Sequence, residues 1–186
     1  IYHQASKTAQ KPIAMIITCC DSRILENTIF GGGIGDYFVH RNVANIVPSK
    51  NDKELNIQTL SAIEYAVKVL KIPNLIILGH SNCGGVEYSY KTLKDNKNVN
   101  NFEYINKWVS CLKYSYNKIP KDLSENEKII FFEQESIKQS IRNLSEYEFI
   151  DKLINENKLN VIGLWYQIHS GLIKFLDNKN RFTNLD

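Results

Sequence analysis

The side chains best suited to chemistry gather in two short clusters. The first, TCCDSRI over Thr18–Ile24, places two thiols, a carboxylate and a guanidinium within five consecutive positions. The second, GHSNCGG over Gly79–Gly85, places His80 and Cys83 three residues apart. Imidazole and thiolate at this spacing can bind one metal ion together. With a cysteine from the first cluster they form a Cys2His set, which suits zinc and leaves a tetrahedral ion one open position.

Each cluster also has a plainer interpretation. A single His-x-x-Cys pair is more often a packed turn than a zinc site, and Cys19 and Cys20 alone are more often buried small residues. Asp21 and Arg23 alone would form a strand-end salt bridge. A fourth zinc ligand would be Asp21, Cys20 or water. Because both clusters directly follow apolar runs, the metal interpretation is favoured when they are taken together.

Short apolar runs predict the strands that position these clusters. Ile13–Thr18 and Leu75–Leu78 are typical of strands buried on both faces, and Tyr37–Arg41 is a further strand candidate. Leu55–Leu70 has helical spacing, so strand, helix and strand predict a parallel crossover. The glycines of 31–35 lead into a strand rather than a helix, which favours a turn over a phosphate loop.

The second half of the chain predicts helices and a closing hairpin. Polar helical patterns extend to about Asn157, with Pro120 dividing one helix from the next. Val161–Ile168 and Leu172–Leu176 then have the spacing of a β-hairpin. We therefore expect a single α/β domain over residues 1–186, with a mainly parallel central sheet flanked by helices and a C-terminal antiparallel hairpin strand.

Composition limits the partners. The net charge of +3 arises from 23 basic and 20 acidic residues without a basic block, which gives no indication of nucleic acid binding. No apolar run approaches the roughly 20 residues needed to span a bilayer. Four cysteines, two of them adjacent, predict free or metal-bound thiols in a reducing compartment, hence a cytoplasmic protein. Because the chain begins with Ile1, a removed targeting segment stays an open alternative.

The two clusters resemble the β-class carbonic anhydrases. The resemblance lies in Cys19-x-Asp21-Ser22-Arg23 and in His80-x-x-Cys83-Gly84-Gly85. Segments GDYFVHRNVAN, AIEYAVKVL and GLWYQIHSGLIKFL are also similar to the family in order and spacing, so the similarity covers nearly the whole chain.

The resemblance implies a role for each matching residue. One Zn²⁺ would be held by Cys19, His80 and Cys83, with Asp21 and Arg23 as the catalytic pair beside it. The positions that resemble substrate-pocket residues are Gln10, Phe38, Tyr65 and Gly84. The implied activity is the reversible hydration of carbon dioxide to bicarbonate and a proton by a zinc-bound hydroxide, in a homodimer or tetramer.

Two departures from the family pattern stand out. Ile16 and Thr18 replace a tryptophan and a glycine that some bacterial members use in an inhibitory bicarbonate site, which argues against that regulation. The segment before Cys19 is also shorter than the family's N-terminal helical arm, which predicts that part of an arm is missing.

Three rival functions stay open at this point. Carbon disulfide hydrolysis could use the same scaffold. A non-catalytic zinc-stabilised interaction domain would need a fourth protein ligand. A redox role for the adjacent Cys19 and Cys20 would require their thiols to react.

Overall fold

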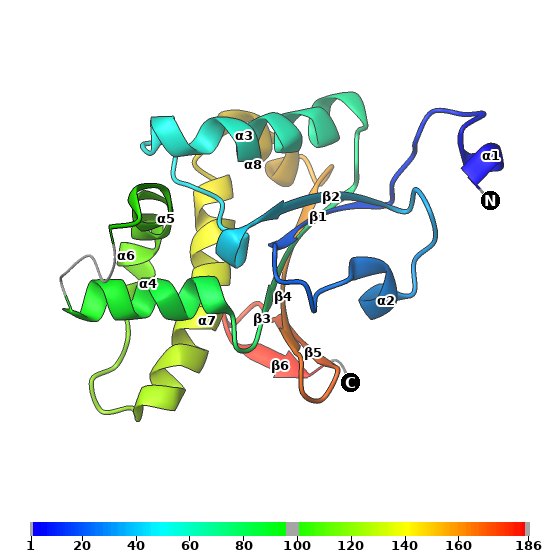
Figure 1. Cartoon of the computed structure of the whole chain (residues 1–186). Helices are drawn as coiled ribbons and strands as arrows, with labels where there is room; N and C mark the ends of the chain where they lie inside the picture. The colour runs from blue at the N-terminus through cyan, green and yellow to red at the C-terminus, as the bar shows by residue number, and fades with distance from the viewer. Residues whose placement is uncertain (1, 96–100, 185–186) are drawn as a thin grey trace.

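The computed structural model describes residues 2–95 and 101–184, and its strands form one sheet in the order β2-β1-β3-β4-β5-β6 (Figure 1). The strands are β1 (Ala14–Cys19), β2 (Tyr37–Asn42), β3 (Asn74–His80), β4 (Asn160–Gln167), β5 (Leu172–Leu176) and β6 (Phe182–Asn184). The first four in spatial order pair in parallel, whereas β5 and β6 are antiparallel to their neighbours. The predicted fold class is confirmed, although the short edge strand β6 was not predicted.

Helices flank this sheet. They are α1 (Tyr2–Ala5), α2 (Glu26–Phe30), α3 (Lys53–Glu64), α4 (Gly84–Asp95), α5 (Glu103–Val109), α6 (Lys113–Tyr116), α7 (Glu125–Leu144) and α8 (Glu148–Asn155), with shorter turns η1 (Val43–Asn45), η2 (Tyr65–Val69) and η3 (Ser110–Leu112). The predicted helix over 55–70 is thus α3 followed by η2, a turn of π-helix. None of the helices in the described part is long and apolar enough to cross a membrane.

Strand alternation divides β1 between the two faces of the sheet. Met15 and Ile17 point into a core made with α3, α7 and α8, whereas Ile16 points to the opposite face, which α2 partly covers. By the same alternation Cys19 lies on the side of Met15 and Ile17, and it packs into a third cluster with α4 and α7. The parity of the strand therefore directs Cys19 into the interior and leaves Cys20 exposed.

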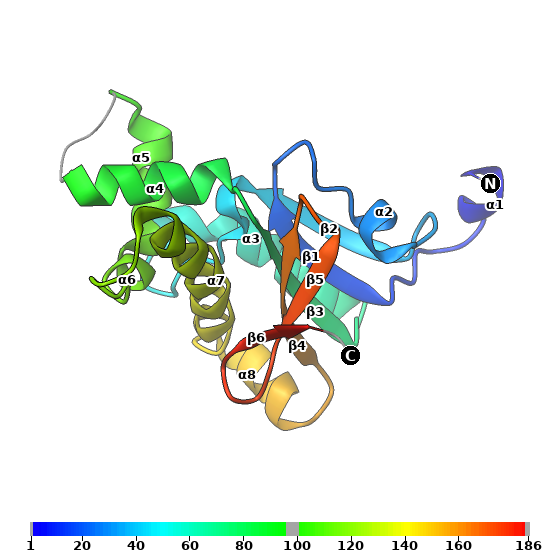
Figure 2. The ribbon, with the colours of Figure 1, turned by 90° about the horizontal axis from the view of Figure 1, so that it is seen from below.

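Figures 1 and 2 show α4, α5 and α6 grouped beside the carboxyl ends of β1 and β3, whereas α1 lies apart on the opposite side. The long helix α7 joins this group of helices to the sheet, because it packs against α4 as well as β3 and β4. It begins with a capping box in which Ser124 and Glu127 bond each other's backbone N–H groups. The sheet edge that carries both polar clusters is thereby backed by a rigid helix.

Candidate metal centre

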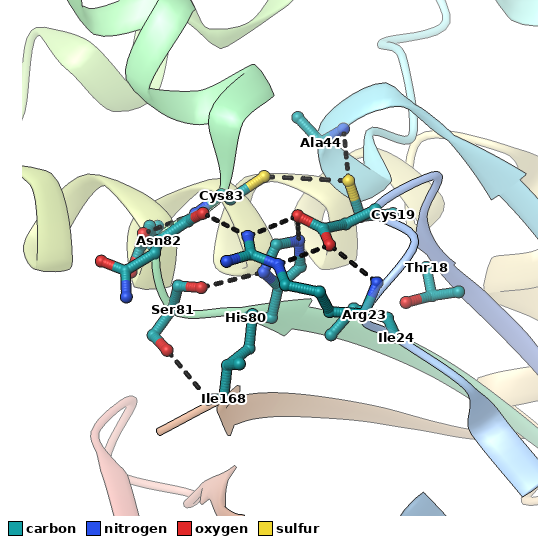
Figure 3. Close-up of polar contacts among 12 residues, drawn as sticks. Thr18, Cys19, Arg23, Ile24, Ala44, His80, Ser81, Asn82, Cys83 and Ile168 are labelled. Carbon is teal, nitrogen blue, oxygen red and sulfur yellow. Dashed lines mark hydrogen bonds and ion pairs between the residues drawn. The ribbon is translucent and has the colours of Figure 1, made fainter. Parts of the chain in front are cut away.

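Three buried side chains converge at the carboxyl ends of β1 and β3. Thr18 pairs with Leu78 in the parallel register, so Cys19 and His80 end neighbouring strands at the same edge of the sheet. The candidate ligand atoms of Cys19, His80 and Cys83 all lie within 4.8 Å of one another. The two sulfurs are 3.8 Å apart and point toward each other in Figure 3. The structure thus brings together the three residues predicted to bind zinc.

The His80 ring is oriented as a metal ligand. Its Nδ1 lies 3.0 Å from the Ser81 carbonyl oxygen, which can only accept, so Nδ1 carries the hydrogen. Its Nε2 is buried and has no hydrogen-bond partner among the described residues. The lone pair of Nε2 is therefore free to bind a metal ion, and a ring held through its other nitrogen is typical of metal-binding histidines. The donor set fits a zinc ion.

Backbone amides surround the two sulfurs. Ala44 N–H donates to Cys19 Sγ at 3.4 Å, and Ala44 and Asn45 adopt left-handed φ values of 65° and 47°. Such values are unfavourable for alanine and mark a local strain, which here aims the Ala44 amide at the sulfur. Cys83 lies directly before α4, whose first amides favour its thiolate.

The pKa values of the two thiols are shifted in opposite directions. A hydrogen bond from Cys83 lowers the pKa of Cys19, and the resulting thiolate raises the pKa of Cys83 well above its usual value. Binding of a dication would release the remaining proton, because both sulfurs must be thiolates to bind zinc.

Asp21 is held by Arg23 beside these ligands. Arg23 Nε donates to Asp21 Oδ1 at 2.9 Å and Arg23 Nη2 donates to Oδ2 at 2.7 Å. Arg23 Nη2 also donates to the Asn82 carbonyl at 3.0 Å, which links the first cluster to the second. The paired guanidinium keeps the pKa of Asp21 well below its usual range. The carboxylate is therefore ionised and fixed in orientation.

The predicted substrate-pocket residues divide into two groups. Gly84 begins α4 next to Cys83, and space lies open where its side chain would be. Phe38 stacks on Tyr65 with ring centroids 5.8 Å apart. In the sheet, Phe38 pairs with Met15, which lies four residues before the candidate ligand Cys19 on β1. That separation is about 13 Å along a strand. Gln10 is exposed in the segment before β1.

Sequence reasoning missed Glu133, a carboxylate on α7 that is 2% exposed. Its Oε1 accepts a hydrogen bond from Cys83 N–H at 3.1 Å, and burial raises its pKa to about 7. One signal was available: Glu133 interrupts an apolar i, i+4 row formed by Ile129 and Ile137. An acidic residue in such a row indicates a specific buried partner.

The fold and this centre define a class of α/β protein in which three buried side chains could hold one metal ion. The chain belongs to the β-carbonic anhydrase family: the family model described as carbonic anhydrase matches residues 14–173. It is 32% identical over 174 residues to beta carbonic anhydrase 3 of Arabidopsis thaliana, covering 92% of this chain and 66% of that protein. It is 31% identical over 175 residues to a carbonic anhydrase of Helicobacter pylori strain J99, covering 92% and 79%.

Solved structures agree with this assignment. The β-carbonic anhydrase CcaA superimposes with a TM-score of 0.89 at 27% identity, covering 99% of this chain and 88% of that one. A structure from a study of two tetrameric β-carbonic anhydrases of Sordaria macrospora gives a TM-score of 0.82 at 32% identity, covering 98% and 87%.

Proposed function

We propose that this protein is a carbonate dehydratase that interconverts carbon dioxide and bicarbonate, using one zinc ion held by Cys19, His80 and Cys83. The observation that carries the proposal is the convergence of two buried thiols and an unpartnered imidazole nitrogen beside a carboxylate fixed by Arg23. A zinc ion bound there would lower the pKa of a coordinated water and supply a nucleophile near neutral pH.

The protein's own groups then orient the reaction. Asp21 can accept a hydrogen bond from the attacking oxygen, because its carboxylate is ionised and lies beside His80. This interaction would leave an oxygen lone pair directed at carbon dioxide. Arg23 prevents the carboxylate from rotating, since it donates to both carboxylate oxygens. Gly84, next to Cys83, would let substrate approach the backbone closely.

The geometry disfavours the rival of a closed, non-catalytic zinc site. Within the described residues, the candidate metal-binding group contains three side chains, and Cys20 lies exposed outside it. Asp21, the other proposed fourth ligand, is engaged by Arg23. An open fourth position is the property that distinguishes catalytic from structural zinc.

We also propose that the enzyme works as a homodimer or tetramer. Exposed apolar side chains on β2, α3 and η2 support an interface there; they are Val39, Ile57, Tyr65 and Val69. The Sordaria structure is described as tetrameric. Phe38 lies four strand residues away from the level of Cys19, too far to line the metal site of its own chain. If Phe38 and Tyr65 line a carbon dioxide pocket, that pocket therefore belongs to a second copy of the chain. Sedimentation velocity on the wild type and on V69E would test this assembly.

We further propose a cytoplasmic location. It is supported by free cysteines, since the buried sulfurs of Cys19 and Cys83 are close together without forming a disulfide. Some relatives are named as mitochondrial or chloroplastic proteins, so cell fractionation is the test.

Stopped-flow measurement of carbon dioxide hydration tests the activity, on protein of known zinc content between about pH 6.5 and 9. We expect the rate to rise toward mildly alkaline pH, because two thiolates neutralise the zinc charge and make its water less acidic. C83S should lose both zinc and activity, whereas C20S, which changes the exposed neighbouring cysteine position, should keep both.

Two results would contradict the proposal. Zinc-loaded wild type without activity at any pH would favour the binding-domain rival. Carbon disulfide hydrolysis exceeding carbon dioxide hydration would favour the other substrate.

A further inference from the structure

The loop between β3 and α4 is held in place by partners from three parts of the chain: the end of β4, the Arg23 segment and α7. Ser81 N–H donates to Tyr166 O of β4 at 2.8 Å, and the Ser81 hydroxyl accepts from Ile168 N–H at 3.0 Å. The Asn82 carbonyl accepts from Arg23, as described above. Figure 3 shows the contacts with Ile168 and Arg23 around His80 and Cys83. The position of Cys83 is thus determined by side chains and strands outside the loop.

Glu133 supplies the contact to the backbone of Cys83 itself. The Cys83 N–H cannot bond within α4, because it precedes the first helical residue, and its partner is Glu133 Oε1 at 3.1 Å. A buried N–H group without a partner is costly, so this bond fixes the backbone from which the sulfur projects.

The burial of Glu133 is hard to explain by stability alone. The side chain is 2% exposed, and among the described residues its second oxygen, Oε2, is buried without a hydrogen-bond partner. The groups that favour its charged form are the Cys83 and Asn82 amides, His80 and the Trp165 indole. The first three belong to the metal site or its loop, whereas Trp165 belongs to the core on one face of the sheet. A carboxylate in such surroundings is unfavourable unless a specific interaction offsets its desolvation.

We propose that Glu133 is a positioning residue of the metal site: its Oε1 holds the Cys83 amide, and thereby sets the position of the Cys83 sulfur relative to Cys19 and His80. The rigid element behind it is α7, which packs against β3, β4 and α4. Outer-shell partners of this kind typically change metal affinity 10- to 100-fold when they are removed. The inference deepens the proposed function, because it concerns the metal site on which that function rests.

Metal affinity gives the test, by competition with a chromophoric chelator, together with the absorption spectrum of the cobalt-substituted protein. E133M keeps the side-chain volume but removes the acceptor, and E133D keeps the charge but withdraws the acceptor by one methylene. We expect both to bind zinc at least about 10-fold more weakly and to shift the thiolate-to-cobalt band. E133Q retains an acceptor oxygen and should bind zinc within about threefold of the wild type.

Q139M is the matched control. Gln139 is another buried polar residue of α7, and its amide contacts Ser115 and Cys111 rather than the metal loop. It should lose stability but keep zinc affinity. Because two variants displace the acceptor, a folding defect in one leaves the other informative.

Wild-type affinity in E133M and E133D would overturn the proposal, as would a loss in E133Q equal to that in E133D. Since the readout is metal affinity, these results would overturn the positioning role of Glu133 without contradicting the proposed carbonic anhydrase activity. A wild type that fails to bind zinc would instead contradict the proposed function.

Discussion

Asp21 Oδ2 lies 3.9 Å from His80 Nε2, the buried ring nitrogen for which the described residues provide no hydrogen-bond partner. A carboxylate so close to a candidate ligand atom could itself approach a bound metal if it were free to rotate. Arg23 prevents this by donating to both carboxylate oxygens. We therefore expect the guanidinium to keep Asp21 away from a bound metal and so to leave its fourth position open.

We expect R23K to lower kcat/KM for carbon dioxide hydration about 10- to 100-fold while zinc stays bound. Lysine cannot donate to both carboxylate oxygens in a fixed fork, so Asp21 gains freedom and its pKa moves back toward its usual value. Stopped-flow kinetics on zinc-quantified protein gives the measurement. R181K, which alters the exposed pair of Arg181 and Asp177, is the control and should behave as wild type.

We expect G85A to destabilise the fold by about 1–3 kcal/mol, the usual effect of overpacking. A Cβ at Gly85 would lie 2.6 Å from Val43 Cγ1 and 3.2 Å from the Ala44 nitrogen that donates to Cys19. G84A, where the added methyl meets open space, is the neighbouring control. Urea unfolding of both variants checks the difference, and equal stability of the two would refute the packing argument.

We expect His40 to make the protein less stable in mild acid. Burial lowers the pKa of His40, so the unfolded chain binds a proton at pH values where the folded chain does not. Stability should therefore fall as the pH drops through about 6.5, the ordinary histidine value, and continue to fall until the folded imidazole is protonated.

H40Q tests this dependence, because glutamine can still reach Thr59, the hydrogen-bond partner of the ring. The urea midpoint of H40Q should fall less than that of the wild type between pH 7.5 and pH 5, with zinc held constant. Parallel pH dependence in the two proteins would exclude His40 as the source.

We expect iodoacetamide to modify Cys20 first in the zinc-loaded protein, because Cys20 is exposed while Cys19 and Cys83 are buried and engaged. Cys111 should react slowly throughout, since burial raises its pKa to about 12. Chelation should then release Cys19 and Cys83 to the reagent, as peptide mass spectrometry would show. Formation of a Cys19–Cys20 disulfide in zinc-loaded protein would instead support the redox alternative.

Much of the centre could be predicted because it lies at the ends of regular elements. An apolar run followed by a polar cluster indicates a buried strand and its carboxyl end, and this reasoning located the two clusters. The resemblance to the β-class carbonic anhydrases then named Cys19, His80 and Cys83 as ligands, and the structure brings these three together. The alternation of β1 explains why Cys19, and not Cys20, is turned inward.

The parts that escaped prediction depend on tertiary contacts. The left-handed backbone at Ala44 has no sequence signal, since alanine rarely adopts it, and it persists because surrounding contacts determine it. Glu133 lies 50 residues from Cys83, and only the packing of α7 against the sheet brings the two together. The three-residue strand β6 is too short to show a periodicity.

The separation of the ligands along the chain determines when the metal can act during folding. Cys19 and Cys83 are 64 residues apart, and they meet only after β1 and β3 have paired across the α3 crossover. The conformational entropy of closing so long a loop must be lost before one ion can bind all three ligands. We therefore expect zinc not to nucleate folding, in contrast to proteins whose ligands are close in sequence. We also expect the sheet to form before the three ligands can bind a metal together. If so, zinc should slow unfolding more than it accelerates folding.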